Sequence, residues 1–220
     1  MTIGLIIQAR TGSTRLPNKT LLLVDKKNSV LSSVLSQVKH SALVDKIVVA
    51  TTNLPSDDRI VDLVNTLKIN YFRGDEQDVL DRFYHCAKKF NFSIIVRITS
   101  DNPLIDPEII DKSIKKMYEM KCNFVTNCFP RTFPQGTEVE IFDFTTLEKI
   151  WNDATLLEDR EHVTKFIYKH PEIFTIYNIQ SKKQIPNMRW TVDTLDDLTF
   201  VKAIFSKIHK SPILTNDILN

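Results

Sequence analysis

The chain has 220 residues, with 29 Lys and Arg against 27 Asp and Glu, and its formal net charge is +2. This length suits one α/β domain with a full core and is short for two, so we expect residues 1–220 to form a single domain. The small net charge offers no basic excess that would bind a polyanion, which argues against a nucleic-acid partner.

Cysteine usage and the first residues indicate the compartment. The 3 cysteines, Cys86, Cys122 and Cys128, form no CxxC pair and are best explained as reduced core thiols. The apolar run after Met1 is interrupted by Arg10, which is too early for a signal segment or a membrane-spanning segment. We therefore expect a cytoplasmic protein without a membrane partner.

In the first half of the chain, short β-rich apolar runs alternate with helical periodicity. The strand-like runs are 3–8, 46–51, 69–72, 93–98 and 123–126. The helical runs between them are 30–39, 56–67, 79–90 and 107–120. This βαβ series predicts an α/β fold with a mostly parallel central sheet, helices on both faces, and ligands at the carboxyl ends of the strands.

The pattern changes from about residue 129. The stretch PQGTEVEIF, 134–142, alternates like an exposed or edge strand. Helical runs follow near 144–151 and 159–169, then short strands at 174–179 and 188–192 and a closing helix from Leu195. No flexible linker separates the halves, so we expect 129–192 to extend the first half as a lid, an acceptor-binding element or a dimerisation element.

A cluster of cations and small polar residues follows the first strand, in IIQARTGSTRLPNKTLL, 6–22. Gly12 permits a tight backbone, and Ser13 and Thr14 add donors, so successive N–H groups could face phosphate oxygens. The accompanying cations are Arg10, Arg15 and Lys19. The loop has neither the GxxxxGK[ST] nor the GxGxxG pattern. It is either a solvated turn or a phosphate site, and three cations beside a Gly-Ser turn favour phosphate.

Two aspartates are each predicted to end a strand. They are Asp101, in RITSDNPLIDP, and Asp193, in RWTVDTLDDL. Taken singly, Asp101 is best explained as a turn former and Asp193 as part of a helix cap. Together, facing a cationic loop, they fit Mg²⁺, which takes one or two carboxylates plus phosphate and water oxygens. Alternation also places Glu138 and Glu140 on one face of a strand, which is either a substrate-facing pair or a solvated edge.

An ordered set of motifs covers nearly the whole chain. It consists of IIQARTGSTRLPNKTL, KIVVATT, FRGDEQDVLDRF, VRITSDNPLIDP, PQGTEVEIF, EDREHVTKFIYKHPE and RWTVDTLDDL. The set resembles the SpsF-type cytidylyltransferases of cell-surface polysaccharide synthesis and, more distantly, the CMP-KDO and CMP-sialic acid synthetases. The resemblance implies a Rossmann-like nucleotide-diphospho-sugar transferase fold, Mg²⁺ dependence and a homodimer. Many relatives have Gly where Asn18 stands, and Asn tolerates left-handed backbone angles better than most residues.

The resemblance also implies roles for individual residues. It places on CTP the residues Gln8, Ala9, Arg10, Gly12, Ser13, Arg15 and Lys19. It places Asp101 and Asp193 on the metal, and it assigns catalysis to Arg10, Arg15, Lys19 and Asp101. Related enzymes hold the nucleobase or ribose at Arg73, Gly74, Asp75 and Asp78, and the acceptor at Arg97, Glu138 and Glu140. The signature at Arg160, Glu161 and His162 has no assigned role and could pair with neighbours or with a dimer partner.

The implied reaction is nucleotidyl transfer, in which an acceptor oxygen attacks the α-phosphorus of CTP and pyrophosphate leaves. The acceptor could be a sugar acid with an anomeric hydroxyl, or it could carry a phosphate or phosphonate. Two alternatives stay open. A nucleotide-sugar-dependent glycosyltransferase would normally show a DxD pattern at a strand end, and a non-catalytic nucleotide-binding protein would be expected to have lost the cations or the strand-end acids.

Overall fold

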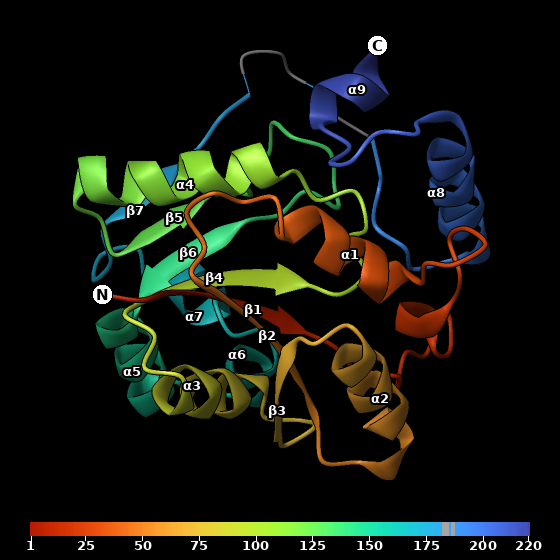
Figure 1. Cartoon of the computed structure of the whole chain (residues 1–220). Coiled ribbons are helices and arrows are strands. Elements are labelled where there is room, and N and C mark those ends of the chain that lie inside the picture. Colours follow the sequence, from red (N-terminus) through yellow and green to blue (C-terminus); the bar gives the residue numbers. More distant parts are fainter. Residues whose placement is uncertain (182–184, 186–187) are drawn as a thin grey trace.

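One seven-stranded sheet, with strand order β3-β2-β1-β4-β6-β5-β7, organises the chain (Figure 1). The computed structural model describes residues 1–181, 185 and 188–220. The strands are β1 Ile3–Gln8, β2 Lys46–Thr52, β3 Asn70–Gly74, β4 Ile94–Thr99, β5 Phe124–Thr126, β6 Glu140–Asp143 and β7 Ile176–Asn178. Within the described residues, β6 pairs antiparallel with β4 and β5, and the other neighbours are parallel. This confirms the predicted α/β fold with a mostly parallel sheet.

Helices cover both faces of the sheet. They are α1 Val30–Val38, α2 Asp58–Thr66, α3 Val79–Lys89, α4 Pro107–Met120, α5 Phe144–Asp153, α6 Leu157–Glu161, α7 Lys165–Lys169, α8 Leu195–Lys207 and α9 Thr215–Leu219. One core cluster packs α1, α2 and α4 against the sheet, and a second packs α3, α5 and α7 against the opposite face. Figure 1 shows α1 and α4 on one side of the sheet and α3 and α5 on the other.

Strand β1, which lies between β2 and β4, explains why the strands of this sheet are continuous apolar runs in the sequence. In β1, Leu5 and Ile7 belong to one core cluster and Ile6 to the other, and all three are fully buried. Strands buried on both faces lack polar alternation, as is typical of parallel sheets. Gly4, in the same strand, leaves no room for a side chain, because a Cβ there would lie 2.1 Å from the Phe92 ring. A third cluster around Trp190 and Val192 includes Leu198 and Val201 of α8.

Three expectations for the second half are wrong. The stretch 134–142 does not form an edge strand, because β6 begins only at Glu140 and lies between β4 and β5. The predicted strand 188–192 is reduced to a single bridge between Arg189 and Gln135 in its described part. The predicted helix 159–169 is divided into α6 and α7, because Val163 takes a left-handed backbone conformation with φ 52°.

Within the described residues, no helix combines the length and the apolar character that crossing a membrane requires.

A buried carboxylate ties the loop after β1 to the end of β2. Asp57, which is 1% exposed, accepts hydrogen bonds from the Thr11 backbone N–H at 2.8 Å and the Thr11 hydroxyl at 2.6 Å. The Thr52 hydroxyl donates to its other oxygen at 2.5 Å. Burial alone would raise the pKa of Asp57, but the hydrogen bonds from Thr11 and Thr52 outweigh it and lower the pKa. Asp57 thereby fixes the backbone between Arg10 and Gly12.

We predict that Asp57→Ala lowers the free energy of unfolding by about 2–3 kcal/mol, because it leaves several buried donors unsatisfied. Since the folded pKa lies below the ordinary value of 3.8, the carboxylate stabilises the fold above that pH and loses this effect as the pH falls through the folded pKa. Urea unfolding at several pH values should therefore show that the difference in the free energy of unfolding between wild type and variant becomes smaller in acid. Asp58→Ala is the control, because Asp58 forms a largely exposed pair with Arg73. Equal losses in both variants would contradict the assigned role.

Candidate active site

A cavity of about 710 Å³ opens at the carboxyl ends of β1 and β4. This volume lies in the range of small-molecule sites. The predicted site residues that line it are Gln8, Ala9, Arg10, Gly12, Ser13, Arg15, Lys19, Arg97, Asp101, Glu138, Glu140 and Asp193. The structure thus brings together the predicted phosphate loop, both strand-end aspartates and the three predicted acceptor-side residues.

The loop after β1 turns tightly at Gly12 and again at Asn18. The N–H groups of Ser13 and Asn18 both donate to the carbonyl of Thr11, at 2.8 Å and 3.1 Å. Asn18 has φ 57°, which fits the left-handed conformation expected where relatives have Gly. Gly12 lies at the centre of the tight turn that the Ser13 bond closes, and it has no positive φ. A Cβ at Gly12 would lie 3.2 Å from a carboxylate oxygen of Glu76, so its small size also limits contact with that side chain.

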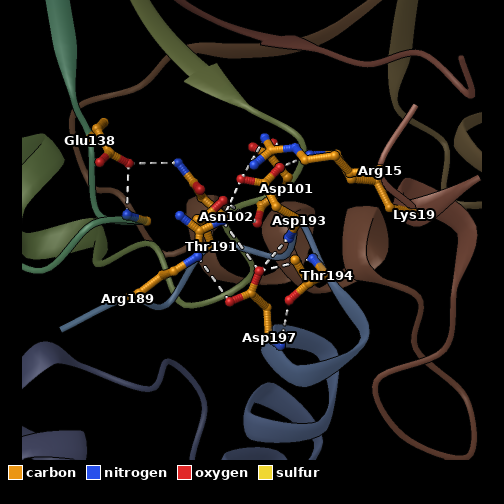
Figure 2. A network of polar contacts seen from close by, with 11 residues as sticks. Arg15, Lys19, Asp101, Asn102, Glu138, Arg189, Thr191, Asp193, Thr194 and Asp197 are labelled. Atoms are coloured by element: carbon orange, nitrogen blue, oxygen red, sulfur yellow. Dashed lines mark hydrogen bonds and ion pairs between the residues drawn. The ribbon is translucent and has the colours of Figure 1, made fainter. Parts of the chain in front are cut away.

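Three segments that are distant in sequence converge on one ammonium group (Figure 2). The Lys19 Nζ lies 2.5 Å from Asp101 Oδ2 and 2.6 Å from Asp193 Oδ1. The backbone N–H of Val192 donates to the Asp101 carbonyl at 2.8 Å, which joins the two aspartate segments. Burial acts to raise the pKa of Asp193, but Lys19, Arg189 and Arg15 together lower it. The Asp193 carboxylate is therefore held ionised at the point where it meets Asp101 and Lys19.

The donor set at this point fits a hard divalent cation. Two carboxylate oxygens within 2.6 Å of one nitrogen atom already converge as metal ligands do. Mg²⁺ commonly takes one or two protein carboxylates and fills its remaining positions with phosphate and water oxygens. The described residues contain no group of three or more His, Cys, Asp or Glu arranged for a metal, so Asp101 and Asp193 could hold Mg²⁺ only together with such oxygens.

Two further cations stand closer to solvent. Arg15 Nη2 lies 3.0 Å from Asp193 Oδ2, and the Arg15 side chain is 65% exposed. Arg10 Nη2 lies 3.6 Å from a carboxylate oxygen of Glu161 across the cavity. Exposed ion pairs of this kind are weak. Both guanidinium groups are therefore free to turn toward an anionic ligand in the cavity.

The opposite wall is centred on a buried Arg–Glu pair. Arg97 donates through Nη1 to Glu140 and through Nε to the Gln8 side chain at 3.1 Å. Glu140, which is 5% exposed, also accepts from the Thr164 hydroxyl at 2.9 Å and the Tyr168 hydroxyl at 2.8 Å. Burial and the Glu140 charge raise the pKa of Tyr168, so its hydroxyl stays a donor. Because both Glu140 oxygens are engaged, this carboxylate orients Arg97.

Glu138, the other predicted acceptor-side carboxylate, is anchored differently. It accepts from the Asn102 amide at 3.0 Å, from the Gly136 N–H at 2.8 Å and from Arg131. Gly136 has φ 102°, and a Cβ there would lie 2.4 Å from the Thr191 nitrogen, so only glycine fits. This turn directs Glu138 toward Asn102, which follows Asp101.

Four predicted nucleotide-binding residues do not line the cavity: Arg73, Gly74, Asp75 and Asp78. Arg73 donates to the carbonyls of Thr52 and Leu54, each at 2.8 Å, and pairs with Asp58. Asp75 accepts two backbone N–H groups of the following turn, and Asp78 caps α3. These side chains thus serve the local structure between β3 and α3.

Sequence reasoning missed Arg82 and the pair formed by Arg189 and Asp197. Arg82 lines the cavity at 2% exposure, its Nη1 donates to the Asp75 carbonyl, and its Nε has no partner among the described residues. Burial lowers the pKa of Arg82 to about 10. Arg189 and Asp197 lie within the motif RWTVDTLDDL, so the signal was present, but only the fold shows that they contact Asp193 and its backbone.

The signature residues Arg160, Glu161 and His162 have separate surroundings. Arg160 pairs with Asp78 at 2.6 Å and donates to the carbonyls of Trp151 and Ala154 at the end of α5. Glu161 and His162 line the cavity, Glu161 beside Arg10. Arg160 and Glu161 thus both form ion pairs within this chain.

Comparison with known proteins gives consistent matches. A family model described as Cytidylyltransferase matches residues 5–210. The spore coat polysaccharide biosynthesis protein SpsF of Bacillus subtilis is 33% identical over 215 residues, covering 94% of this chain and 88% of that protein. The 3-deoxy-manno-octulosonate cytidylyltransferase of Pelobacter propionicus is 32% identical over 121 residues, covering 54% of this chain and 46% of that enzyme.

Among solved structures, a cytidylyltransferase from Leptospira borgpetersenii serovar Hardjo-bovis superposes with a TM-score of 0.95 at 33% identity, covering 100% of this chain and 92% of that chain. The predicted Rossmann-like nucleotidyltransferase fold is thereby confirmed. Because the family model spans most of the chain and the likeness to SpsF extends over nearly all of it, the protein belongs to the cytidylyltransferase family.

Proposed function

We propose that the protein transfers CMP from CTP to an oxygen of a sugar-type acceptor, with release of pyrophosphate. The observation that carries this proposal is the convergence of two strand-end aspartates and a cationic loop in one ligand-sized cavity. Family membership supports CTP as the nucleotide. The likeness to SpsF, named for spore coat polysaccharide biosynthesis, supports a role in making a cell-surface polysaccharide or glycoconjugate.

Catalysis would depend mainly on positioned charge. The acceptor oxygen attacks the α-phosphorus, the bond to the β-phosphate oxygen breaks, and negative charge accumulates on the leaving pyrophosphate. Arg10, Arg15 and Lys19 would neutralise that charge from the loop after β1. Asp101 and Asp193 would hold Mg²⁺, which when bound supplies positive charge beside the reacting phosphates. Lys19 would then exchange its two carboxylates for phosphate oxygens, and the mechanism needs no protein nucleophile.

The acceptor would occupy the wall formed by the second half of the chain. Arg97 and Glu138 would contact it, with Glu140 orienting Arg97. Both carboxylates lie within 129–192, which supports a role for this segment in acceptor binding within a single domain 1–220. The acceptor is a sugar, a sugar acid, or a related phosphate or phosphonate. The resemblance to SpsF-type enzymes also supports a homodimer located in the cytoplasm.

Pyrophosphate release tests the proposed function directly. With Mg²⁺ and a panel of sugar, sugar-acid and sugar-phosphate acceptors, we expect sustained release from CTP that depends on the acceptor. Thermal-shift titration should show stabilisation by CTP above that by ATP or GTP, because a ligand that binds only the folded state raises its stability. Preference for a purine triphosphate, or turnover of nucleotide sugars without pyrophosphate, would overturn the assignment.

We predict that Lys19→Ala and Arg15→Ala each lower kcat/KM for CTP by tens-fold, the loss of a charge-assisted phosphate contact of about 2 kcal/mol. The effect of Lys19 should be larger, since Lys19 is 13% exposed in its ion pairs and Arg15 is 65% exposed. Pyrophosphate kinetics give the result, with circular dichroism to confirm folding. Lys112→Ala, on the exposed side of α4, is the control and should leave kcat/KM unchanged. Normal kinetics in either loop variant would remove that residue from the site.

We predict that Asp101→Asn and Asp193→Asn each abolish most turnover, because Asn keeps the shape but removes a charge that the cation needs. The double variant should be scarcely worse than either single one, since both residues would act through one ion. Steady-state pyrophosphate release across a Mg²⁺ titration measures this, again with circular dichroism as the folding control. If the two residues were only a turn former and a helix cap, Asn would serve at both positions and rates would stay near normal.

A further inference from the structure

The two oxygens of the Asp193 carboxylate have different neighbours (Figure 2). Oδ1 lies 2.6 Å from Lys19 Nζ, on the side where Asp101 also contacts that nitrogen. Oδ2 accepts from Arg189 Nη2 at 2.5 Å and lies 3.0 Å from Arg15 Nη2. Oδ1 therefore faces the point shared with Asp101, and Oδ2 is bound on its other side by the Arg189 guanidinium group.

Arg189 is in turn fixed by Asp197 in the first turn of α8. Its Nε donates to Asp197 Oδ1 at 2.9 Å, and its Nη2 lies 3.3 Å from Asp197 Oδ2. Asp197 Oδ2 also accepts the backbone N–H of Asp193 at 2.9 Å. Asp197 is thus bonded both to the backbone of Asp193 and to the cation that holds the Asp193 side chain.

Helix capping accounts for only part of this arrangement. Thr194 and Asp197 form a capping box, in which the Asp197 N–H donates to the Thr194 hydroxyl at 3.2 Å and the Thr194 N–H donates to Asp197 Oδ2 at 2.9 Å. A capping box needs one Asp197 oxygen. The other oxygen, Oδ1, is directed at Arg189, which lies outside the helix and contributes nothing to its cap.

We propose that Arg189 and Asp197 are positioning residues for Asp193. They engage Oδ2 and leave Oδ1 directed at the point where Asp101 and Lys19 meet, which is where the divalent cation of the proposed function would bind; the inference rests on that function. Groups that orient a metal-binding carboxylate typically change metal affinity by 10–100-fold when removed. Arg189 would also keep a positive charge beside the Asp193 carboxylate once Lys19 has turned toward the triphosphate.

Mn²⁺ binding to the protein saturated with CTP, without an acceptor, tests the proposal; it is followed by the electron paramagnetic resonance signal of the free ion and corrected for Mn²⁺ bound to CTP alone. We expect Arg189→Gln and Asp197→Asn to weaken Mn²⁺ binding at least 10-fold, and Asp101→Asn to abolish it. Thr194→Ala is the matched control, because it removes the capping hydroxyl and leaves the Arg189 contacts intact. It should lower the melting temperature without changing Mn²⁺ affinity. In assays, the Mg²⁺ concentration for half-maximal rate should rise at least 10-fold in Arg189→Gln, with KM for CTP at saturating Mg²⁺ unchanged.

The outcomes separate this inference from the function on which it rests. If wild type with CTP binds no Mn²⁺ beyond that held by CTP alone, or Asp101→Asn binds it normally, the metal site of the proposed function is wrong. If wild type binds Mn²⁺ but Arg189→Gln and Asp197→Asn bind it equally well, the positioning role is wrong. If Thr194→Ala weakens binding as much as Asp197→Asn, Asp197 acts only as a helix cap. Should Asp197→Asn not fold, Arg189→Gln decides alone, since it leaves the capping box unchanged.

Discussion

The site depends on the cost of placing two carboxylates beside each other. At an effective dielectric constant of about 20, two like charges about 5 Å apart repel by roughly 3 kcal/mol. Lys19 lies between Asp101 and Asp193 and offsets this repulsion, and Arg15 and Arg189 contact Asp193 from the other side. The need to offset this repulsion explains why a protein with almost balanced net charge concentrates Arg and Lys in one loop. In the proposed function the same cations would also bind the triphosphate.

The sheet topology sets what lies on each side of this charged point. Strand β4, which leads to Asp101, pairs in parallel with β1 and antiparallel with β6. The loop after β1 therefore emerges on one side with its cations. On the other side β6 runs in the opposite direction, so its first residue, Glu140, lies at the same sheet edge and opposite Arg97. The change of strand direction thus places the proposed phosphate-binding loop and the proposed acceptor-side wall on either side of Asp101.

The sequence predicted best the features that local pattern determines. The parallel strands follow from apolar runs, and α1 to α4 follow from helical periodicity. The cations of the loop after β1 are evident from its composition. Alternation failed at 134–142 because Glu140 is buried, and its burial is compensated by Arg97, Thr164 and Tyr168 from three other segments. For the same reason the pattern does not reveal Arg82, whereas Arg73 is assigned to the site by the family resemblance alone and does not line the cavity. Which charged side chain on a helix or strand end faces the cavity is decided by packing, to which periodicity is insensitive.

The turn between α6 and α7 places one strained residue in the wall that we propose for the acceptor. Val163 is fully buried and has φ 52°, a conformation that is rare for a β-branched residue and costs about 1–3 kcal/mol. A regular helix through this position would avoid that cost. It would, however, change the directions of Glu161 and His162, which line the cavity, relative to Thr164, whose hydroxyl holds Glu140. The strained residue therefore separates the side chains that face the ligand space from the one that orients Arg97 through Glu140, and the fold retains the strain where it shapes the site.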